Sequence, residues 1–172
     1  EKAEAHIRNG YSLIIAGVYL LLILGIVYIR GTGEPELTAI QLEKEHTLQT
    51  LCAEKGTPET YIALGVFYYE HFLSSRAEET FSRVEKGSRD YPLAKAYLAA
   101  LKGREAQTTP IPSNKLEYVN RAVLTLNKLV KTYPGNLEIR YCRALFFSEL
   151  PAIFKQRPIA RKDIEFILAK SA

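Results

Sequence analysis

The chain lacks the residue patterns that most catalytic and metal sites require. Its three histidines, His6, His46 and His71, are isolated, and no group of His and Cys residues has the spacing of metal ligands. A phosphate-binding loop is also missing, because Gly31 and Gly33 have neither a third glycine nor a predicted strand before them. There is no Gly-x-Ser-x-Gly motif and no setting for a Cys–His nucleophile. The sequence therefore predicts a protein that is not an enzyme and that binds no cofactor or metal.

Methionine and tryptophan are absent, and cysteine is scarce. Because none of the 172 residues is a methionine, we expect the natural start of the protein to lie upstream, in a leader or a processed segment. Cys52 and Cys142 form no Cys-x-x-Cys pair, so we expect two small buried hydrophobic side chains. A disulfide between them would require an oxidising compartment.

Charge is plentiful but unevenly distributed. The net charge is +4, yet residues 31–113 contain 9 basic and 12 acidic side chains, whereas residues 114–172 contain 11 and 5. Hydrophobic residues make up 47% of the chain, which suits a packed domain and argues against global disorder. This charge pattern is typical of solvated helical surfaces, and the basic half is also suited to an anionic surface or partner.

One long uncharged run lies near the N-terminus. Residues 11–29 contain no charged side chain, and a helix of 19 residues is about 28 Å long, close to the thickness of a bilayer core. Arg8 and Arg30 flank the run, and an aromatic residue lies near each of its ends, as at membrane interfaces. No Ala-x-Ala site follows, as it would after a secretory signal. The sequence predicts a short N-terminal segment at 1–10 and a single transmembrane helix at 11–30.

The flanking charges are equal in number on the two sides of this predicted helix. Since a short basic N-terminus usually stays inside, we expect the following domain to lie outside the cytoplasm, in the periplasm or an equivalent compartment. Small residues along the helix would allow a second membrane helix to approach closely. These candidate interface residues are Ser12, Ala16, Gly17 and Gly25.

Residues 31–56 form a linker and a further helix. Pro35 is suited to a helix start, and apolar residues recur from there with helical spacing. This pattern predicts an amphipathic helix over 35–55, with Glu45 on its charged, polar face. An N-cap threonine and a first-turn proline then begin a second domain, over 57–172.

The most specific pattern lies at the start of this second domain. It reads Tyr61-x2-Leu64-Gly65-x2-Tyr68, followed by Ala77-x3-Phe81. A helix pair of this kind has a gap at Gly65 and Ala77, where the backbones approach and aromatic rings fill the space. The pattern resembles the tetratricopeptide repeat (TPR), a 34-residue helix–turn–helix unit. The resemblance implies helices over about 58–73 and 75–88.

The remaining chain follows the repeat less closely. A second unit would begin at Pro92, but its second helix starts about 11 residues late, after an insert at 107–113. We expect this proline-containing insert to be a surface loop, or a loop that contacts a partner. A third unit would pair helices over 137–150 and 158–170. The resemblance thus implies an all-α fold, with one transmembrane helix followed by a TPR-like α-solenoid of about three helix pairs.

Two arginines depart from the repeat pattern in the third unit. Arg140 and Arg143 occupy positions where bulky apolar residues are usual, and they would contact either the fold itself or a ligand. In a register shifted by one residue, each arginine could pair with Asp163 or Glu165 on the next helix. The core residues of that register would be Ile139, Cys142, Phe146 and Leu150.

The resemblance also implies a binding surface, because TPR arrays bind ligands on their concave side. The corresponding residues form an apolar groove that suits a peptide or a helix: Glu59, Ile62, Val66, Tyr69, Leu93, Ala96, Tyr141 and Leu145. Alternatively, the helix over 35–55 or the ends of the array pack there.

A basic cluster near the C-terminus is interpreted as a solvated face or as a contact for anionic lipid headgroups. It consists of Lys155, Arg157, Arg161 and Lys162. Nucleic acid is not an expected partner of a membrane-tethered repeat protein, although stacking aromatics lie near these cations.

Together, these expectations predict a membrane-anchored scaffold that recruits or stabilises a protein partner. The chain would contact the bilayer through residues 11–29. The alternative is a permanent accessory subunit of a large membrane complex, such as a translocon or a respiratory or assembly machinery. A recruiter should purify alone and bind peptides, whereas a subunit should be unstable without its complex.

Overall fold

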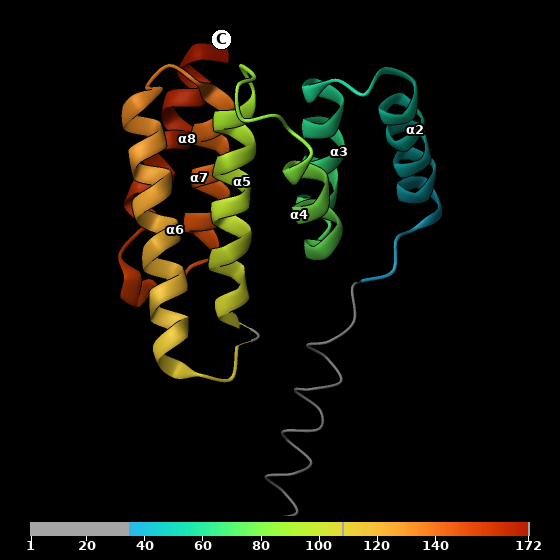
Figure 1. Ribbon diagram of the computed structural model, residues 1–172. Coiled ribbons are helices and arrows are strands. Elements are labelled where there is room, and N and C mark those ends of the chain that lie inside the picture. Colours follow the sequence, from blue (N-terminus) through green and yellow to red (C-terminus); the bar gives the residue numbers. More distant parts are fainter. Residues whose placement is uncertain (1–34, 108, 172) are drawn as a thin grey trace, which may run out of the picture. The chain divides into compact units, whose positions relative to one another are not determined.

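The computed structural model describes residues 35–107 and 109–171 (Figure 1). The chain divides into two compact units, residues 1–34 and 35–172, so all described residues belong to the second unit. The predicted transmembrane helix at 11–30 lies outside them, as do its interface residues Ser12, Ala16, Gly17 and Gly25. Within the described ranges, no helix is both long enough and apolar enough to cross a bilayer.

Every regular element in the described part of the chain is a helix, which confirms the all-α class. The α-helices are α2 (Ala39–Lys55), α3 (Pro58–Glu70), α4 (Ser74–Ser82), α5 (Tyr91–Arg104), α6 (Pro112–Thr132), α7 (Leu137–Glu149) and α8 (Arg157–Ser171). Two short 3-10 helices, η1 (Glu105–Gln107) and η2 (Ala152–Phe154), follow α5 and α7. The predicted insert at 107–113 is only partly a loop, because Pro112 already occupies the first turn of α6.

Local sequence signals explain where α2 begins and ends. The Thr38 hydroxyl accepts a hydrogen bond from the Gln41 backbone N–H, and the Gln41 side chain accepts one from the Thr38 N–H. This capping box starts the helix four residues later than the proline at position 35 predicted. Gly56 ends it with a φ of 57°, a left-handed conformation that glycine adopts without a steric penalty.

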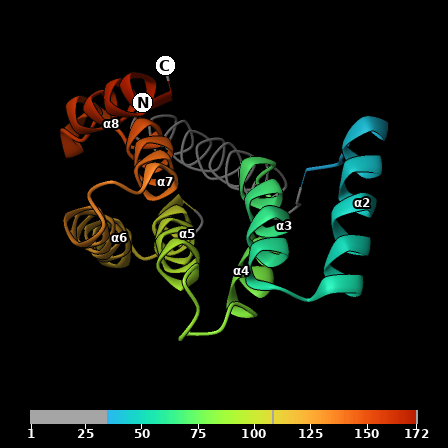
Figure 2. The ribbon, with the colours of Figure 1, turned by 90° about the horizontal axis from the view of Figure 1, so that it is seen from above.

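The helices of the second unit form two rows (Figure 2). α3 packs on α4, α5 on α6 and α7 on α8, and successive helices run in opposite directions (Figure 1). The inner row is made of α3, α5 and α7, in which α5 contacts both neighbours, and the outer row is made of α4, α6 and α8. α2 packs on α3 and extends the array at its N-terminal end. The result is a solenoid-like stack of three helix pairs preceded by one helix.

The close approach predicted at Gly65 is present in the core. A Cβ atom placed on Gly65 would lie 2.6 Å from the Phe81 ring, so only glycine leaves room for that ring. Phe81 is fully buried and stacks on Tyr97, with ring centroids 4.9 Å apart. Gly103 makes room for Phe146 in the same way. Two glycine-to-ring contacts therefore set the spacing between the helices.

The shifted register of the third helix pair is confirmed. Ile139 and Cys142 are fully buried, and Phe146 and Leu150 are nearly so. Asp163, on α8, is also fully buried and accepts hydrogen bonds from both arginines of α7. Arg140 Nη1 lies 2.7 Å from Asp163 Oδ1, and Arg143 binds both carboxylate oxygens at 2.7 Å. The predicted pairing of these arginines thus occurs with Asp163, while Glu165 pairs with Arg161 on its own helix.

Replacing Gly65 by alanine should destabilise the domain. The added methyl group would displace the buried Phe81 ring, and overpacking of this kind costs about 1–3 kcal/mol. The measurement is urea unfolding of the full chain in detergent, followed by circular dichroism. Gly87→Ala is the matched control, because a Cβ added there would meet no other atom within 4 Å. Equal stability of the two variants would contradict the proposed close approach.

Replacing Asp163 by asparagine should be more damaging. It leaves two largely buried guanidinium groups without a counter-charge, and breaking a buried ion pair costs about 3 kcal/mol or more. Glu165→Gln, which alters an exposed pair two residues away, should change stability by less than about 0.5 kcal/mol. The same unfolding titration compares them, and a neutral Asp163→Asn variant would show that this cluster does not hold α7 to α8.

Candidate functional site

An open pocket lies on the inner row of helices, and we call it the inner pocket. Its volume is about 370 Å³, and four helices contribute to it. Its walls are Val66 of α3, Leu93 and Tyr97 of α5, Leu137, Glu138 and Tyr141 of α7, and Ile167 and Ser171 of α8. Apolar side chains predominate, so the pocket is suited to an apolar side chain of a partner rather than to a charged metabolite.

Tyr141 is the most accessible aromatic residue of the inner pocket. It is 41% exposed, and its hydroxyl donates a hydrogen bond to Glu70 Oε1 at 3.2 Å. Partial burial, together with the charge of Glu70, raises the pKa of the Tyr141 hydroxyl. The side chain therefore stays neutral over the physiological range and offers a ring with a polar tip, a combination that is common in protein interfaces.

The structure brings together only some of the residues predicted to line a groove. Val66, Leu93 and Tyr141 meet in the inner pocket, although Leu93 is only 4% exposed and lies at its base. Glu59, at the first turn of α3, is exposed, and Leu145 is half-buried, but neither lines this pocket.

Ile62, Tyr69 and Ala96 are buried, so their prediction as open groove residues is wrong. Tyr69 and Ala96 have no exposed surface, and Ile62 has 8%. The reason is the close packing of α3 on α5, which places the Tyr69 ring 5.0 Å from that of Tyr97. A smaller concave surface than predicted is therefore accessible.

The helix α2 does not cover the inner pocket. It packs on α3 through Glu45, which was predicted to be solvated but is 6% exposed. Glu45 Oε1 accepts hydrogen bonds from the Tyr68 hydroxyl and Arg76 Nη1, both at 2.9 Å, and from Gln49. Burial raises the pKa of Tyr68, so that its hydroxyl remains a donor. In Figure 2, α2 lies on the opposite side of α3 from α5.

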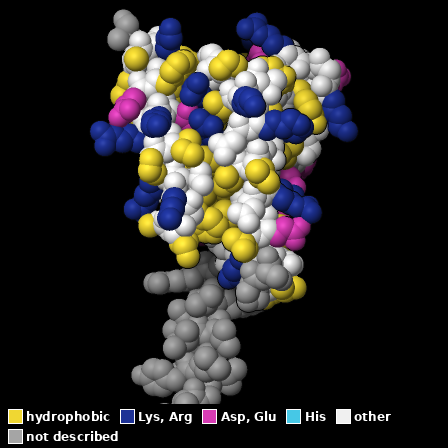
Figure 3. All heavy atoms as spheres, turned by 90° about the vertical axis from the view of Figure 1, so that its left-hand side faces the viewer, with side chains coloured by type: hydrophobic (Ala, Val, Ile, Leu, Met, Phe, Trp, Pro, Cys, Tyr) yellow, Lys and Arg dark blue, Asp and Glu magenta, His cyan; other side chains and the backbone are white. Residues whose placement is uncertain are grey.

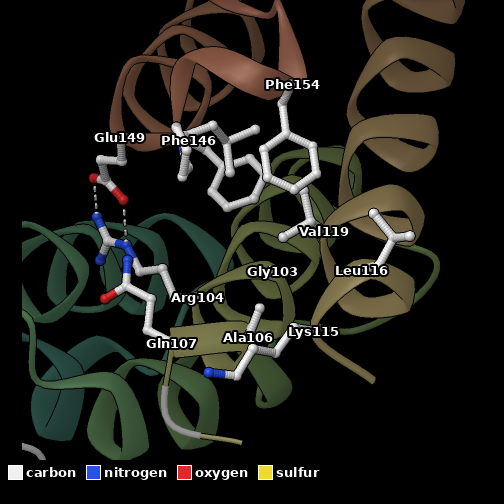
Figure 4. Close-up of a pocket in the computed structure, with 12 residues that line it drawn as sticks. Gly103, Arg104, Ala106, Gln107, Lys115, Leu116, Val119, Phe146, Glu149 and Phe154 are labelled. Atoms are coloured by element: carbon white, nitrogen blue, oxygen red, sulfur yellow. Dashed lines mark hydrogen bonds and ion pairs between the residues drawn. The ribbon is translucent and has the colours of Figure 1, made fainter. Parts of the chain in front are cut away.

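A second pocket, which we call the lower pocket, lies between the ends of α5, α6 and α7 (Figure 4). Its volume is about 480 Å³. Figure 4 shows the rings of Phe146 and Phe154 close to Val119, with Leu116 at one side and the Arg104–Glu149 pair at the other. The sequence did not predict this pocket, because its walls come from three helices and from η2. The apolar residues on both sides of the predicted insert are the sequence feature that could have indicated this pocket.

Arg104 joins the three inner helices beside the lower pocket. Its guanidinium donates to Glu149 Oε2 at 2.8 Å and Oε1 at 2.5 Å, and to the Tyr69 carbonyl at 2.7 Å. It also lies over two rings, 3.5 Å from the centroid of Tyr69 and 4.7 Å from that of Phe72. Only 8% of the Arg104 side chain is exposed. Sequence reasoning assigned it no role, because an arginine at the end of a helix is usually solvated.

The predicted basic cluster is exposed on the connection to α8 and on its first turns. Lys155, Arg157, Arg161 and Lys162 are all solvent-accessible. Arg161 is paired with Glu165 at 2.8 Å, so its charge is partly compensated. Among residues 35–107 and 109–171, no group of three or more His, Cys, Asp or Glu side chains is placed to hold a metal ion.

No protein-family model, curated protein or solved structure matches this chain. Its function has to be inferred from its own residues and their arrangement.

The two cysteines should differ in reactivity. Burial raises the pKa of the Cys142 thiol and keeps it protonated, while Cys52 is only half-buried; both are free. Since the thiolate is the reactive form, a maleimide should label Cys52 at least about tenfold faster than Cys142 in the folded chain. Mass spectrometry of peptides locates the label. The two thiols should react alike after unfolding in urea, and equal labelling of the folded chain would contradict the buried position of Cys142.

Proposed function

We propose that this protein is a membrane-anchored helical-repeat scaffold of the TPR type, whose inner pocket binds a segment of a partner protein. The observation that carries the proposal is the inner pocket itself. Four helices spread over residues 58–171 supply its apolar walls, and a partly exposed tyrosine is available for contact. Pockets with one aromatic anchor and a polar rim are typical of peptide-binding surfaces.

The chemistry of the pocket favours a particular kind of segment. Glu138 lies in its wall and Glu70 beside Tyr141, so the rim is acidic while the base is apolar. A helix or extended peptide with an apolar anchor and a neighbouring Lys or Arg would complement both features. Such binding requires neither a cofactor nor a catalytic residue.

The uncharged run at residues 11–29 supplies the proposed tether. Its length suits a bilayer core, and only five residues separate it from the described domain. Tethering raises the local concentration of the domain near membrane partners, so a pocket of modest affinity is sufficient.

A permanent accessory subunit is the second candidate, and one observation favours it. The outer helices expose four large apolar side chains: Leu124 is 70% exposed, Leu168 64%, Leu116 55% and Ile164 46%. An obligate subunit would bury such residues against its complex. A chain produced without its complex would then be degraded or aggregate, whereas a recruiter would remain folded in detergent.

A photo-crosslinking amino acid at Tyr141 should capture the partner in cells. Tyr133 is the matched control, since it is 42% exposed but does not line the inner pocket. We expect a defined adduct from position 141 at least about fivefold stronger than from position 133, because central anchors dominate an interface. Adding Val66→Glu, which places a charge in the same pocket, should abolish the adduct. Equal adducts from both tyrosines, or an adduct that survives Val66→Glu, would exclude the inner pocket as the binding site.

A further inference from the structure

The alternating directions of the helices bring particular connections to one end of the domain (Figure 1). The connections 71–73, 105–111 and 150–156 all lie at this end, which we call the basal end. Since α2 runs opposite to α3, the described chain also begins there, at Pro35. The inner pocket lies toward the other end, because its residues come from the first turns of α5 and α7 and the last turns of α8.

Large apolar side chains are exposed at the basal end. Ile153 is 82% exposed, Ile40 81%, Phe72 58%, Leu116 55% and Ile111 51%. Toward the opposite end, the exposed large hydrophobic residues are Leu168 in the last turn of α8, at 64%, Tyr133 after α6, at 42%, and Tyr141 in the second turn of α7, at 41%. The lower pocket adds further apolar surface beside Leu116. Figure 3 shows hydrophobic side chains gathered in the lower half of the face that it draws, with Lys and Arg around them.

The uncompensated positive charge at the basal end lies on the side of α6 and α8. Within the described residues, Lys115, Lys155 and Arg157 have no acidic partner. Several nearby acids are compensated, because Glu105 pairs with Lys102, Glu117 with Arg121 and Glu149 with Arg104. Glu36, Glu43 and Glu70 are exposed acids without such a pair in the described residues, and they lie on the other side of this end, before α2 or on α2 and α3. Exposed apolar tips with cations beside them match the interface of an anionic bilayer, where apolar groups enter the headgroup layer and cations bind phosphates.

The length of the chain before Pro35 limits where the basal end can lie. Six residue steps separate Ile29 from Pro35, and even a fully extended chain spans only about 20 Å over that number. If residues 11–29 cross the bilayer, Pro35 and the end of the domain around it are held close to the membrane surface. The opposite end is farther away by about the length of α6, roughly 30 Å.

We propose that the basal end of this domain rests on an anionic lipid surface, with Ile153, Leu116 and Ile111 in the headgroup layer and Lys115, Lys155 and Arg157 on lipid phosphates. This inference rests on the proposed tether at residues 11–29. It gives the domain a defined orientation relative to the bilayer. The inner pocket then faces away from the bilayer and stays open to a partner.

Because the chain has no tryptophan, a single introduced indole reports on one position. Full-length chains carrying Ile153→Trp or Tyr133→Trp are reconstituted in phosphatidylcholine vesicles with or without phosphatidylglycerol. Lipids brominated near the headgroup quench an indole that lies in that layer. We expect Ile153→Trp fluorescence to fall about twofold or more in anionic vesicles, and Tyr133→Trp fluorescence to be almost unchanged. Adding Lys155→Glu and Arg157→Glu should restore most of the Ile153→Trp signal.

Flotation of the vesicles separates the two hypotheses. If the chain does not float with them, both the tether and the basal contact are wrong. If it floats but Ile153→Trp fluorescence is not quenched, or if both tryptophan variants are quenched equally, the basal contact is wrong and the tethered scaffold stands. An unquenched indole is also the result expected if position 153 contacts a protein instead of lipid. Circular dichroism confirms that each variant is folded, which is expected because Ile153 is 82% exposed.

Discussion

The inner row of helices depends on one buried guanidinium, that of Arg104. It extends from the end of α5 to the last carbonyls of α3 and to the last carboxylate of α7, so three helices end around one side chain. The planar group is covered by the rings of Tyr69 and Phe72, and its donors are directed to oxygens in its plane. Truncating it would leave Glu149 and the Tyr69 carbonyl without their partner and would remove a contact shared by three helices. The wall of the lower pocket formed by Arg104 and Glu149 follows from this geometry.

Arg104 is one of three buried charged clusters, and each lies at a different helix interface. Glu45 holds α2 against α3 and α4, Arg104 connects α3, α5 and α7, and Asp163 joins α7 to α8. Apolar contacts such as Gly65 against Phe81 supply area and set the spacing of the helices, but they are not directional, and small slips along a helix axis leave none of their groups without a hydrogen-bond partner. Hydrogen-bonded ions do not tolerate such slips, because a slip leaves a charge buried without a partner. The apolar core thus stabilises the stack, and the charged clusters define its register.

The predictions were correct where the sequence pattern was local, or where two residues of one kind recurred at helical spacing. The Gly65 and Phe81 contact follows from a pattern within 21 residues, and the pairing of Arg143 with Asp163 follows from two arginines in an otherwise apolar stripe. They failed where burial depended on a neighbour that is distant in sequence. Glu45 is surrounded by charged residues and therefore indicated a solvated face, yet Tyr68 and Arg76 cover it. Tyr69 was wrongly predicted to lie in an open groove. It is buried because α5 packs closer to α3 than a concave surface would allow.

Arg104 also limits how such an array can grow. In a repeat protein whose interfaces are alike, a duplicated unit finds the same partner surfaces as its parent, so length varies readily between relatives. Here Arg104 of α5 binds both neighbouring pairs, through Tyr69 of α3 and Glu149 of α7, so a pair inserted on either side of α5 and α6 would separate it from one of these partners. Inserting a helix pair at either place would therefore leave a buried polar group without its partner, so the order of these three pairs is specified as strictly as the fold of each.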